Sequence, residues 1–561
     1  MGPTLAVSDQ VHAEKYRAAG ETFRDAATRM ADGMKSSSKH FHALRDAFLD
    51  MRILPAGRVQ SAVGSTRQVT PVNCFVGREI EDSMDGIMLA ASECAATLRM
   101  GGGWGSDFST IRPRGELIRS LQSSASGPVS FMEVFNSICG TVCSAGHRRG
   151  AMMGILRVDH PDILDFVAAK RNENSLTNFN ISVAVTDEFM RAVEADGSFD
   201  LRFGGRVYPT VRASTLWAEI MGSTWDWAEP GIIFIDAVNR LNNLWYCETI
   251  AATNPCAEQP LPPFGACLLG SFNLVRYVYR SGHNLDFDFG QFSVDVHHFV
   301  RGMDNIIDGA IYPLREQRHE EMQKRRMGLG ITGAANAIEA LGYPYGSPEF
   351  VATLQTILKA LRDAAYTASC NLAEERGPFP LFDAELYSNG RFIKTLPPEI
   401  QERIAAGGIR NSHLTSIAPT GTISMTADNI SSGIEPVFAH EYDRTVIMPA
   451  GPQVYRMQDY GLARFGVRGR TAAECSVQEH LAVLCAASAL VDSAVSKTCN
   501  VGPDVSWDDF RGVYFDAWRN GAKSCSTFRL NGKRGGVLKA TELDGAACRI
   551  DPETGARSCD V

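Results

Sequence analysis

The feature that most limits the possible folds is an alternation of short apolar runs and amphipathic segments from about residue 70 to 535. The run GIIFIDAV (231–238) has the length and composition of a buried strand. The segment that follows GSPEF (346–350) has apolar residues at helical spacing, with Ser347 as a possible cap and Pro348 in the first turn. Alternating strands and helices favour a largely parallel sheet, wound or closed, with helices outside it.

The residue patterns at the two ends of the chain differ from this alternation. Residues from about 8 to 52 carry apolar side chains three and four apart, which predicts a helical N-terminal region over 1–70. Beyond about 530 the sequence is Gly-rich and weakly apolar, which predicts a mobile tail over 536–561. The catalytic unit is then expected over 71–535.

Charge and hydropathy exclude some classes of function. The net charge of −9 gives no support to a nucleic-acid-binding surface, which needs a basic patch. The N-terminus has no basic start and no apolar segment of the kind found in secretory signals. The longest apolar run, LAVLCAASALV (481–491), falls short of the roughly 20 residues that span a bilayer. We therefore expect a soluble, cytoplasmic protein that binds neither membrane nor nucleic acid.

The 14 cysteines are expected to be mostly free thiols, because the chain has no export signal. None forms a CxxC pair, and no Cys/His cluster has the spacing of a zinc site, so no metal site is predicted. Cys94, Cys139 and Cys370 lie in apolar, helix-like contexts, where a thiol packs as a small hydrophobic group.

The stretch AATNPCAEQPL (251–261) raises a different possibility for one cysteine. In an extended segment Asn254, Cys256 and Glu258 would project to one face as an amide, a thiol and a carboxylate. A nucleophilic cysteine would need a neighbouring histidine, and no histidine occurs between His160 and His283. A partner from a distant part of the chain stays open, as does one-electron chemistry at the sulfur.

The longer stretch TNPCAEQPLPPFGACLLGSFNL (253–274) resembles the finger loop of the ribonucleotide reductase catalytic subunit. PVNCFV (71–76), SAGHRRGAMMGILRVDHPDILDF (144–166), RRMGLGITG (325–333) and IAPTGTISM (417–425) follow the same family in the same order. The resemblance implies a ten-stranded α/β barrel with a central finger loop, an N-terminal helical region and a mobile C-terminal tail.

The resemblance also implies a role for each residue of the finger loop. Cys256 would be the thiyl radical that removes the 3′-hydrogen of a ribonucleotide, while Glu258 accepts the 3′-hydroxyl proton and Asn254 binds ribose hydroxyls. Cys74 and Cys267 would supply two electrons and close into a disulfide. From its own segment alone, FGACLLG, Cys267 would be interpreted as a buried thiol.

Two further segments are candidates for binding nucleotides. APTGTISM (418–425) offers hydroxyls and backbone N–H groups at the start of a helix, and the family's substrate phosphate would contact Thr420, Gly421, Thr422 and Ser424. A plain surface turn is the alternative. The family's specificity loops would contain Arg112, Arg114, His147, Arg148 and Arg149. They would bind a deoxynucleoside triphosphate or ATP effector at a homodimer interface; a solvated basic turn is the alternative.

The family has several classes that differ in the source of the radical, and this chain lacks the motifs of two of them. Where one class of the family has a relay of two tyrosines, this chain has Thr527 and Phe528. It ends in ARSCDV, without the glycyl-radical motif of another class. The sequence of the finger loop most resembles that of the cobalamin-dependent class, so adenosylcobalamin is the expected cofactor. The base-off motif DxHxxG is absent, so no histidine ligand to cobalt is expected.

The tail and the N-terminus complete the expectations from the family. Cys548 and Cys559 would re-reduce the active-site disulfide by thiol exchange, with thioredoxin or glutaredoxin as the outer reductant. Two incidental exposed thiols are the alternative. The family's ATP-cone domain is expected to be missing, because the DMRILPAGR segment (50–58) comes too early.

Three rival functions remain at this point. GLGITG (328–333) satisfies GxGxxG, but it follows the charged run EEMQKRRM instead of a buried strand. We interpret it as a packing turn, with an NAD-linked oxidoreductase as the distant alternative. The others are a reductase that depends on a second subunit and a non-catalytic nucleotide-binding module. Diphosphate and triphosphate substrates are both open, with diphosphates favoured by the resemblance.

Overall fold

The computed structural model describes residues 2–142, 150–172, 174–448, 451–502 and 504–529. Its main sheet contains two sets of parallel strands. The first set is β2 (Cys74–Val76), β3 (Gly103–Asp107), β6 (Met152–Arg157), β7 (Phe179–Val185) and β10 (Gly231–Phe234). The second set contains β13 (Ala266–Asn273), β16 (Met327–Thr332), β19 (Thr498–Val501) and β20 (Ser524–Arg529).

The two sets meet at antiparallel seams and close on themselves. One seam joins β10 to β20, and the other joins β2 to β13. On the far side of β16, parallel bridges join Leu329 to Thr415 and Ile417 to Val495, and residue 495 leads directly into β19. Nine named strands and the segment 413–417 therefore form a closed circuit of ten. The predicted ten-stranded α/β barrel is confirmed.

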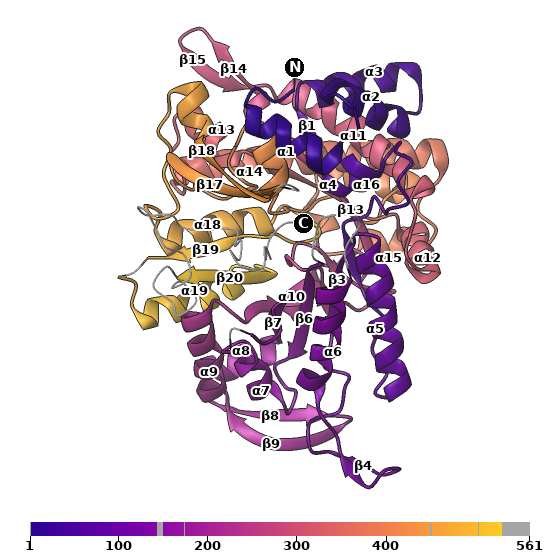
Figure 1. Ribbon diagram of the computed structural model, residues 1–561, viewed down its shortest axis with the longest axis vertical. Coiled ribbons are helices and arrows are strands. Elements are labelled where there is room, and N and C mark those ends of the chain that lie inside the picture. Colours follow the sequence, from indigo (N-terminus) through magenta and orange to yellow (C-terminus); the bar gives the residue numbers. More distant parts are fainter. Residues whose placement is uncertain (1, 143–149, 173, 449–450, 503, 530–561) are drawn as a thin grey trace.

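Helices connect most successive strands and cover the outside of the barrel (Figure 1). Those of the first half are α5 (Met84–Arg99), α6 (Pro128–Thr141), α7 (Ile163–Ala168), α8 (Asp187–Glu194), α9 (Ala213–Trp227) and α10 (Ile235–Arg240). Those of the second half are α11 (Phe289–Gly309), α12 (Arg315–Lys324), α13 (Ala334–Ala340), α14 (Pro348–Arg376), α15 (Ala384–Ser388), α16 (Pro398–Gly407), α18 (Val477–Ser488) and α19 (Trp507–Arg519). The short helix α17 (Gly421–Thr426) is instead buried over its whole length.

The N-terminal region is helical, with one short strand that joins the main sheet. It contains α1 (Ala6–Tyr16), α2 (Phe23–Met34), α3 (Ser38–Leu49) and α4 (Gly57–Ala62). The short strand β1 (Ile53–Pro55) pairs antiparallel with the distal part of β13. Figure 1 shows α1, α2 and α3 together at one end of the molecule, next to α11.

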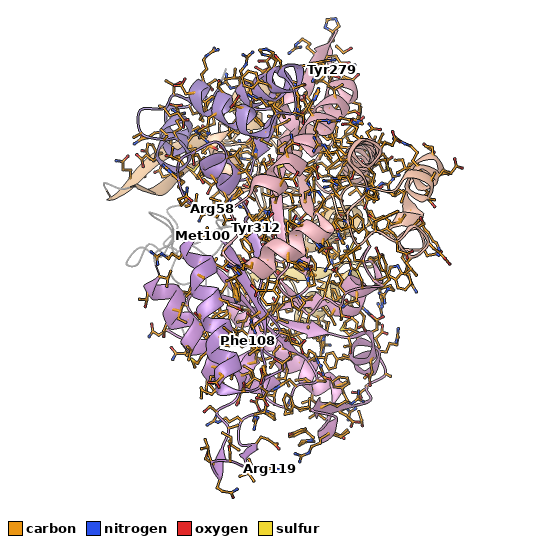
Figure 2. The ribbon with its side chains drawn as sticks, turned by 90° about the vertical axis from the view of Figure 1, so that its right-hand side faces the viewer. Arg58, Met100, Phe108, Arg119, Tyr279 and Tyr312 are labelled. Atoms are coloured by element: carbon orange, nitrogen blue, oxygen red, sulfur yellow. The ribbon has the colours of Figure 1, made fainter. Side chains whose placement is uncertain are left out.

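Four hairpins project from this frame. They are β4 (Leu117–Ile118) with β5 (Ser123–Ser124), β8 (Ser198–Phe203) with β9 (Arg206–Arg212), β14 (Val278–Ser281) with β15 (Asn284–Phe287), and β17 (Glu441–Met448) with β18 (Gly451–Gln458). Figure 2 shows Arg119 of the first hairpin and Tyr279 of the third at opposite ends of the molecule.

Local sequence signals predicted some elements well and others only in part. α14 begins as expected, since the Ser347 side chain accepts a bond from the Phe350 N–H and Pro348 is the first helical residue. The run GIIFIDAV was predicted as a strand throughout, but only Gly231–Phe234 is strand and α10 begins at Ile235. No helix in the described part of the chain is long and apolar enough to cross a membrane.

The interpretation of GLGITG as a packing turn is wrong. Residues Met327–Thr332 form the fully buried strand β16, and α13 follows directly after Gly333. A Cβ on Gly328 would lie 2.3 Å from the Gln259 side chain, and one on Gly330 would lie 2.2 Å from the Ser416 carbonyl oxygen. These glycines allow other parts of the chain to pack against the strand, so the space that a dinucleotide would need is filled by protein.

Candidate active site at the centre of the barrel

The finger loop runs through the middle of the barrel. Its stem is the two-residue ladder of β11 (Ala252–Thr253) and β12 (Pro260–Leu261). Its tip is bonded to both halves of the sheet: Asn180 of β7 donates to the Pro255 carbonyl at 2.8 Å, and Ser416 donates to the Glu258 carbonyl at 3.0 Å. The Ala494 N–H also donates to the Glu258 carbonyl at 2.9 Å. The tip is therefore fixed between opposite walls.

Glycine makes room for the loop on the β3 side. A Cβ on Gly105 would lie 1.8 Å from the Thr253 carbonyl oxygen, which is too close for two non-bonded atoms. A Cβ on Gly103 would also lie within 3.1 Å of the Pro255 ring. Glycine at 103 and 105 thus explains how a second layer of backbone fits inside the barrel.

The tip is a tight turn and not the extended segment that the sequence suggested. The Asn254 N–H donates to the Gln259 carbonyl at 3.1 Å, and the Gln259 N–H donates to the Asn254 side-chain oxygen at 2.9 Å. Ala257 has φ of 64°, in the left-handed region. The prediction failed because it used Pro255 alone and could not include the cross-loop bonds of Gln259.

Glu258 lies in an apolar, fully buried environment. One carboxylate oxygen is 3.9 Å from the Cys74 sulfur, which is positioned to donate to it. The other oxygen, Oε2, has no hydrogen-bond partner among the residues that the structure describes. Burial raises the pKa of Glu258 from 4.5 to about 7, against the bonds from Asn254 and Cys74 that lower it. A carboxyl group with this pKa and a free oxygen can exchange a proton near neutral pH.

Cys74 and Cys267 face each other across the β2–β13 seam. They are directly opposed in the antiparallel register, where Cα atoms lie about 4.5–5.5 Å apart. That separation is within the range a disulfide needs. Both are free thiols in the structure and fully buried. Burial and then the Glu258 carboxylate raise the pKa of Cys74 well above its usual value, so the pair is held as neutral thiols.

Cys256 is more accessible than its neighbours. Its thiol is half-buried, whereas Asn254, Glu258, Cys74 and Cys267 are buried. The Asn254 amide donates to the Cys74 sulfur at 3.2 Å, which links the finger tip to the thiol pair. The structure thus brings together all five residues that the sequence singled out as catalytic.

The predicted phosphate segment continues from barrel segment 413–417. Ala418 packs against the same apolar cluster as Cys74 and Cys267, so the segment starts beside the finger tip.

Residues 421–426 form α17, as predicted, and Thr420, with φ of 55°, precedes it. The Thr420 hydroxyl bonds Thr332 at 2.8 Å and accepts from the Gly433 N–H at 2.7 Å. The Ser424 hydroxyl bonds that of Ser432 at 2.9 Å. Gly421 and Thr422 are buried in the same helix.

The predicted effector residues belong to other segments of the chain. Arg112 is held by Asp82, with its Nε at 2.8 Å from a carboxylate oxygen, and Arg114 is exposed near Asp165. Both precede the β4–β5 hairpin. His147, Arg148 and Arg149 lie outside the described residues, as do the tail cysteines Cys548 and Cys559.

Other predicted features can be placed as well. Thr527 lies buried on β20, and its hydroxyl bonds Tyr514 at 2.8 Å. His160, in the segment compared with the cobalamin motif, is buried, with one ring nitrogen 3.0 Å from the Ile111 carbonyl and the other accepting from the Asp162 N–H. In the described part of the chain, no group of three or more His, Cys, Asp or Glu residues could hold a metal ion.

Sequence reasoning missed the residues that hold the finger loop in place. Gln259 lies inside the quoted stretch, and its position next to Glu258 was a usable signal. Asn180 and Ser416 have no such signal, because they are 75 and 158 residues away from the loop atoms they bond.

Comparison with known proteins gives the same family as the resemblance. A model described as the ribonucleotide reductase barrel domain matches residues 72–467 and 468–528. The chain is 37% identical over 521 residues to a vitamin B12-dependent ribonucleoside-diphosphate reductase of Mycobacterium tuberculosis, covering 87% of this chain and 72% of that protein. A protein of the same name from Thermoplasma acidophilum is 34% identical over 83% of this chain and 62% of its own length. The large subunit of the Caenorhabditis elegans ribonucleoside-diphosphate reductase is 29% identical over 67% of this chain and 52% of that protein.

Proposed function

The chain belongs to the ribonucleotide reductase family, and on that premise we propose that it reduces ribonucleotides to 2′-deoxyribonucleotides with adenosylcobalamin as radical source. The relatives from Mycobacterium tuberculosis and Thermoplasma acidophilum are named vitamin B12-dependent, which supports the cofactor. The same names specify ribonucleoside diphosphates, which supports diphosphates as the substrates.

One observation carries the proposal: inside the barrel, a buried pair of opposed thiols on β2 and β13 lies beside the Glu258 carboxyl group of the finger loop, which has a free oxygen. A nucleophilic cysteine enzyme would need a thiolate, and burial disfavours the thiolate form of both Cys74 and Cys267. Hydrogen-atom transfer needs neutral thiols, so the same burial suits radical chemistry.

The reaction assigns a separate task to each residue. Cys256, as a thiyl radical, takes the 3′-hydrogen atom of the ribose, and Glu258 accepts the 3′-hydroxyl proton on its free oxygen. Asn254 holds the ribose hydroxyls, using the amide that now bonds Cys74. The 2′-hydroxyl leaves as water with a proton from the thiol pair. Cys74 and Cys267 give two electrons and the 2′-hydrogen, and their sulfurs close into a disulfide. Glu258 returns the proton to the 3′-oxygen, and Cys256 returns the hydrogen atom to C3′, which restores the thiyl radical.

The partial exposure of Cys256 suits an external radical source. When bound, adenosylcobalamin supplies a carbon radical that can take the hydrogen atom from the Cys256 thiol. Both ring nitrogens of His160 are engaged with the backbone, so this histidine is not available as a ligand to cobalt. A second-subunit relay is disfavoured because Thr527 has no redox-active ring.

Substrate phosphate is assigned to the segment of Thr420, Gly421, Thr422 and Ser424, which starts beside the finger tip. Re-reduction of the buried disulfide is assigned to the tail pair Cys548 and Cys559, with thioredoxin or glutaredoxin as the outer reductant. Both assignments rest on the family pattern.

A homodimer with an effector site is the remaining part of the proposal. α5 exposes Met84, Met88 and Leu89, with 60%, 40% and 47% of their surface accessible. Apolar side chains grouped on one helix are typical of a surface that another protein covers. Arg112 and Arg114 lie at the base of the β4–β5 hairpin and would join this interface to a bound deoxynucleoside triphosphate or ATP.

A single-turnover experiment tests the proposed role of the thiol pair. Pre-reduced protein with adenosylcobalamin, a ribonucleoside diphosphate and no added reductant should yield one deoxynucleotide per site. Mass spectrometry should then find Cys74 joined to Cys267. Product formed while both thiols remain free would contradict the assignment.

A further inference from the structure

A buried lysine outside the finger loop binds main-chain carbonyls near the site. Lys523, the residue before β20, is 3% exposed. Its Nζ donates to the Asp492 carbonyl at 2.6 Å and also to the Ser493 carbonyl. Burial lowers the pKa of Lys523 from 10.5 to about 8, against the raising effect of Asp492, so the ammonium form prevails at neutral pH. A buried cation costs desolvation energy, so its presence calls for a reason.

The residue after these two carbonyls bonds the glutamate of the finger loop. The Ala494 N–H donates to the Glu258 main-chain carbonyl at 2.9 Å. Residues 492–494 are consecutive, so no linker separates the bonds of Lys523 from the bond to Glu258. A shift of the two carbonyls therefore shifts a donor that holds Glu258.

The Asp492 side chain connects the same segment to the second donor of Glu258. Its carboxylate accepts from the Thr415 N–H at 2.9 Å and from the Thr415 hydroxyl at 3.1 Å. The next residue, Ser416, donates its hydroxyl to the Glu258 carbonyl at 3.0 Å. Both donors to this carbonyl therefore belong to segments that meet at Asp492, whose own carbonyl Lys523 binds.

Lys523 is not needed to satisfy the Asp492 carboxylate. That group also accepts from the Tyr366 hydroxyl at 2.7 Å and from the Leu414 N–H at 2.8 Å. The hydrogen bonds of Lys523 go instead to the main chain. An ammonium group has three protons, so one side chain can hold two successive carbonyls. The contact therefore fixes the course of the backbone that leads to Ala494.

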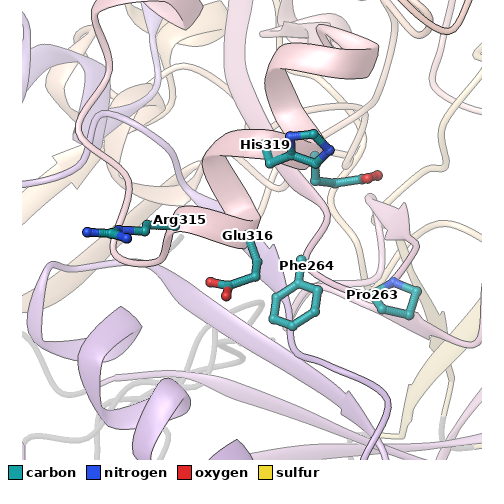
Figure 3. A pocket seen from close by; sticks show the side chains of 6 residues that line it. Pro263, Phe264, Arg315, Glu316 and His319 are labelled. Atoms are coloured by element: carbon teal, nitrogen blue, oxygen red, sulfur yellow. The ribbon is translucent and has the colours of Figure 1, made fainter.

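Open space borders the other end of the finger loop. Pro263 and Phe264, which follow the loop and precede β13, line a surface cavity of about 340 Å³ with Glu316 and His319 of α12. Figure 3 shows these side chains around the cavity. The loop is not closely packed there, so the position of its tip depends more on the hydrogen bonds to Glu258.

We propose that Lys523 is a positioning residue that keeps Glu258 in place for proton transfer, by fixing the segments that hold the Glu258 carbonyl. The inference rests on the proposed function, in which Glu258 accepts the 3′-hydroxyl proton. Lys523 acts indirectly, through residues 492–494. A displacement of about 1 Å at a reacting group can lower a rate by about 100-fold, so a small shift of the Glu258 carboxyl group is enough.

The test compares wild type with Lys523→Met, which keeps an unbranched side chain but has no N–H donor. We expect kcat for deoxynucleotide formation to fall by about 10- to 100-fold, with little change in KM. Exchange of the 5′-hydrogens of adenosylcobalamin with solvent, measured without substrate, should keep its wild-type rate, because it needs Cys256 and not Glu258. A general loosening of the barrel would lower both rates.

A double-mutant cycle with Glu258→Gln tests whether Lys523 acts through Glu258. Adding Lys523→Met to Glu258→Gln should not lower the residual turnover further, because the positioned group no longer accepts a proton. Losses that multiply in the double variant would overturn the proposal. So would a wild-type kcat in Lys523→Met, or an equal loss of hydrogen exchange in that variant.

Lys324→Met is the matched control. Lys324 is also buried and bonds Glu248 at 2.8 Å, and Glu248 keeps its ion pair with Arg326 when Lys324 is removed. Turnover and hydrogen exchange of this variant should match wild type. If Lys523→Met does not fold, Lys523→Gln, which keeps two N–H donors on a shorter side chain, should show the same pattern with a smaller loss of kcat.

A wild type that makes no deoxynucleotide would contradict the proposed function instead. Deuterium exchange of the Ala494 amide, measured by mass spectrometry, then still tests the contact without turnover. It should be faster in Lys523→Met than in Lys324→Met, because the bond to the Glu258 carbonyl is loosened. Equal exchange in the two variants would overturn the proposal.

Discussion

At the scale of single residues, burial is what turns ordinary side chains into this site. Glu258 would have a pKa of 4.5 in water, and the apolar interior of the barrel raises it to about 7. The sequence indicated which residue accepts the proton, through the family motif. It could not indicate the pKa, because the desolvation comes from strands far away in the chain.

The pH dependence of turnover should report Glu258. As the proton acceptor it must be ionised, so activity should rise with pH through about 7. Glu258→Gln should lose activity by about 100-fold or more, the low end for a general base. A steady-state pH profile measures both. A wild-type acidic limb near pH 4.5 would contradict the assignment.

Glu258→Gln, which should lower activity, should raise the free energy of unfolding at alkaline pH. The folded pKa lies above the unfolded value, so ionisation of Glu258 lowers stability as the pH rises from 4.5 through 7. Glu258→Gln removes this cost, so it should unfold at higher denaturant concentration than wild type at pH 8, and the advantage should shrink below pH 5. Urea unfolding at the two pH values measures it. An equal difference in unfolding midpoint between the variant and wild type at both pH values would show that the effect comes from packing and not from ionisation of Glu258.

At the scale of elements, the finger loop and its glycines decide whether the site forms. Gly105→Ala places a methyl group on the Thr253 carbonyl, so we expect a loss of about 1–3 kcal/mol of unfolding free energy and a displaced loop. Gly222→Ala is the control: it lies in α9 with nothing within 4 Å of the added Cβ and should stabilise the protein by about 0.5–1 kcal/mol. Equal stability of Gly105→Ala and wild type would show that the loop is not held against β3.

The sequence predicted elements with local signals and missed those set by distant contacts. Ser347 and Pro348 marked the start of α14, because a cap is made within one turn. The strand β16 was interpreted as a turn because of its glycines. Glycine occurs there because Gln259 and Ser416 pack closely against the strand, and not because the local backbone conformation requires it. The turn at Asn254–Glu258 was missed for the same reason.

At the scale of the whole molecule, alternation of strands and helices indicated a closed or wound sheet, and the family resemblance specified ten strands. The order of the strands and the two antiparallel seams have no signature in the sequence, since they depend on which edges meet. The opposition of Cys74 and Cys267 is a product of one of those seams.

Assembly is tested at the same scale. Met88→Asp puts a charge on the apolar surface of α5, and a dimer formed there should dissociate at least about fivefold more readily, a loss of about 1 kcal/mol or more. Sedimentation equilibrium measures the dissociation constant, with Val294→Asp, at an exposed position of α11, as the control. A monomeric wild type, or a dimer equally stable in Met88→Asp, would contradict this interface.

The central claim is that this chain alone, with adenosylcobalamin, reduces ribonucleotides through a radical on Cys256. The most direct measurement is formation of deoxynucleotide by the purified chain supplied with adenosylcobalamin, a ribonucleoside diphosphate and a dithiol, and with no second protein. The account predicts product from wild type and none from Cys256→Ala or Cys256→Ser. Product from either variant, or product only after a second subunit is added, would contradict it.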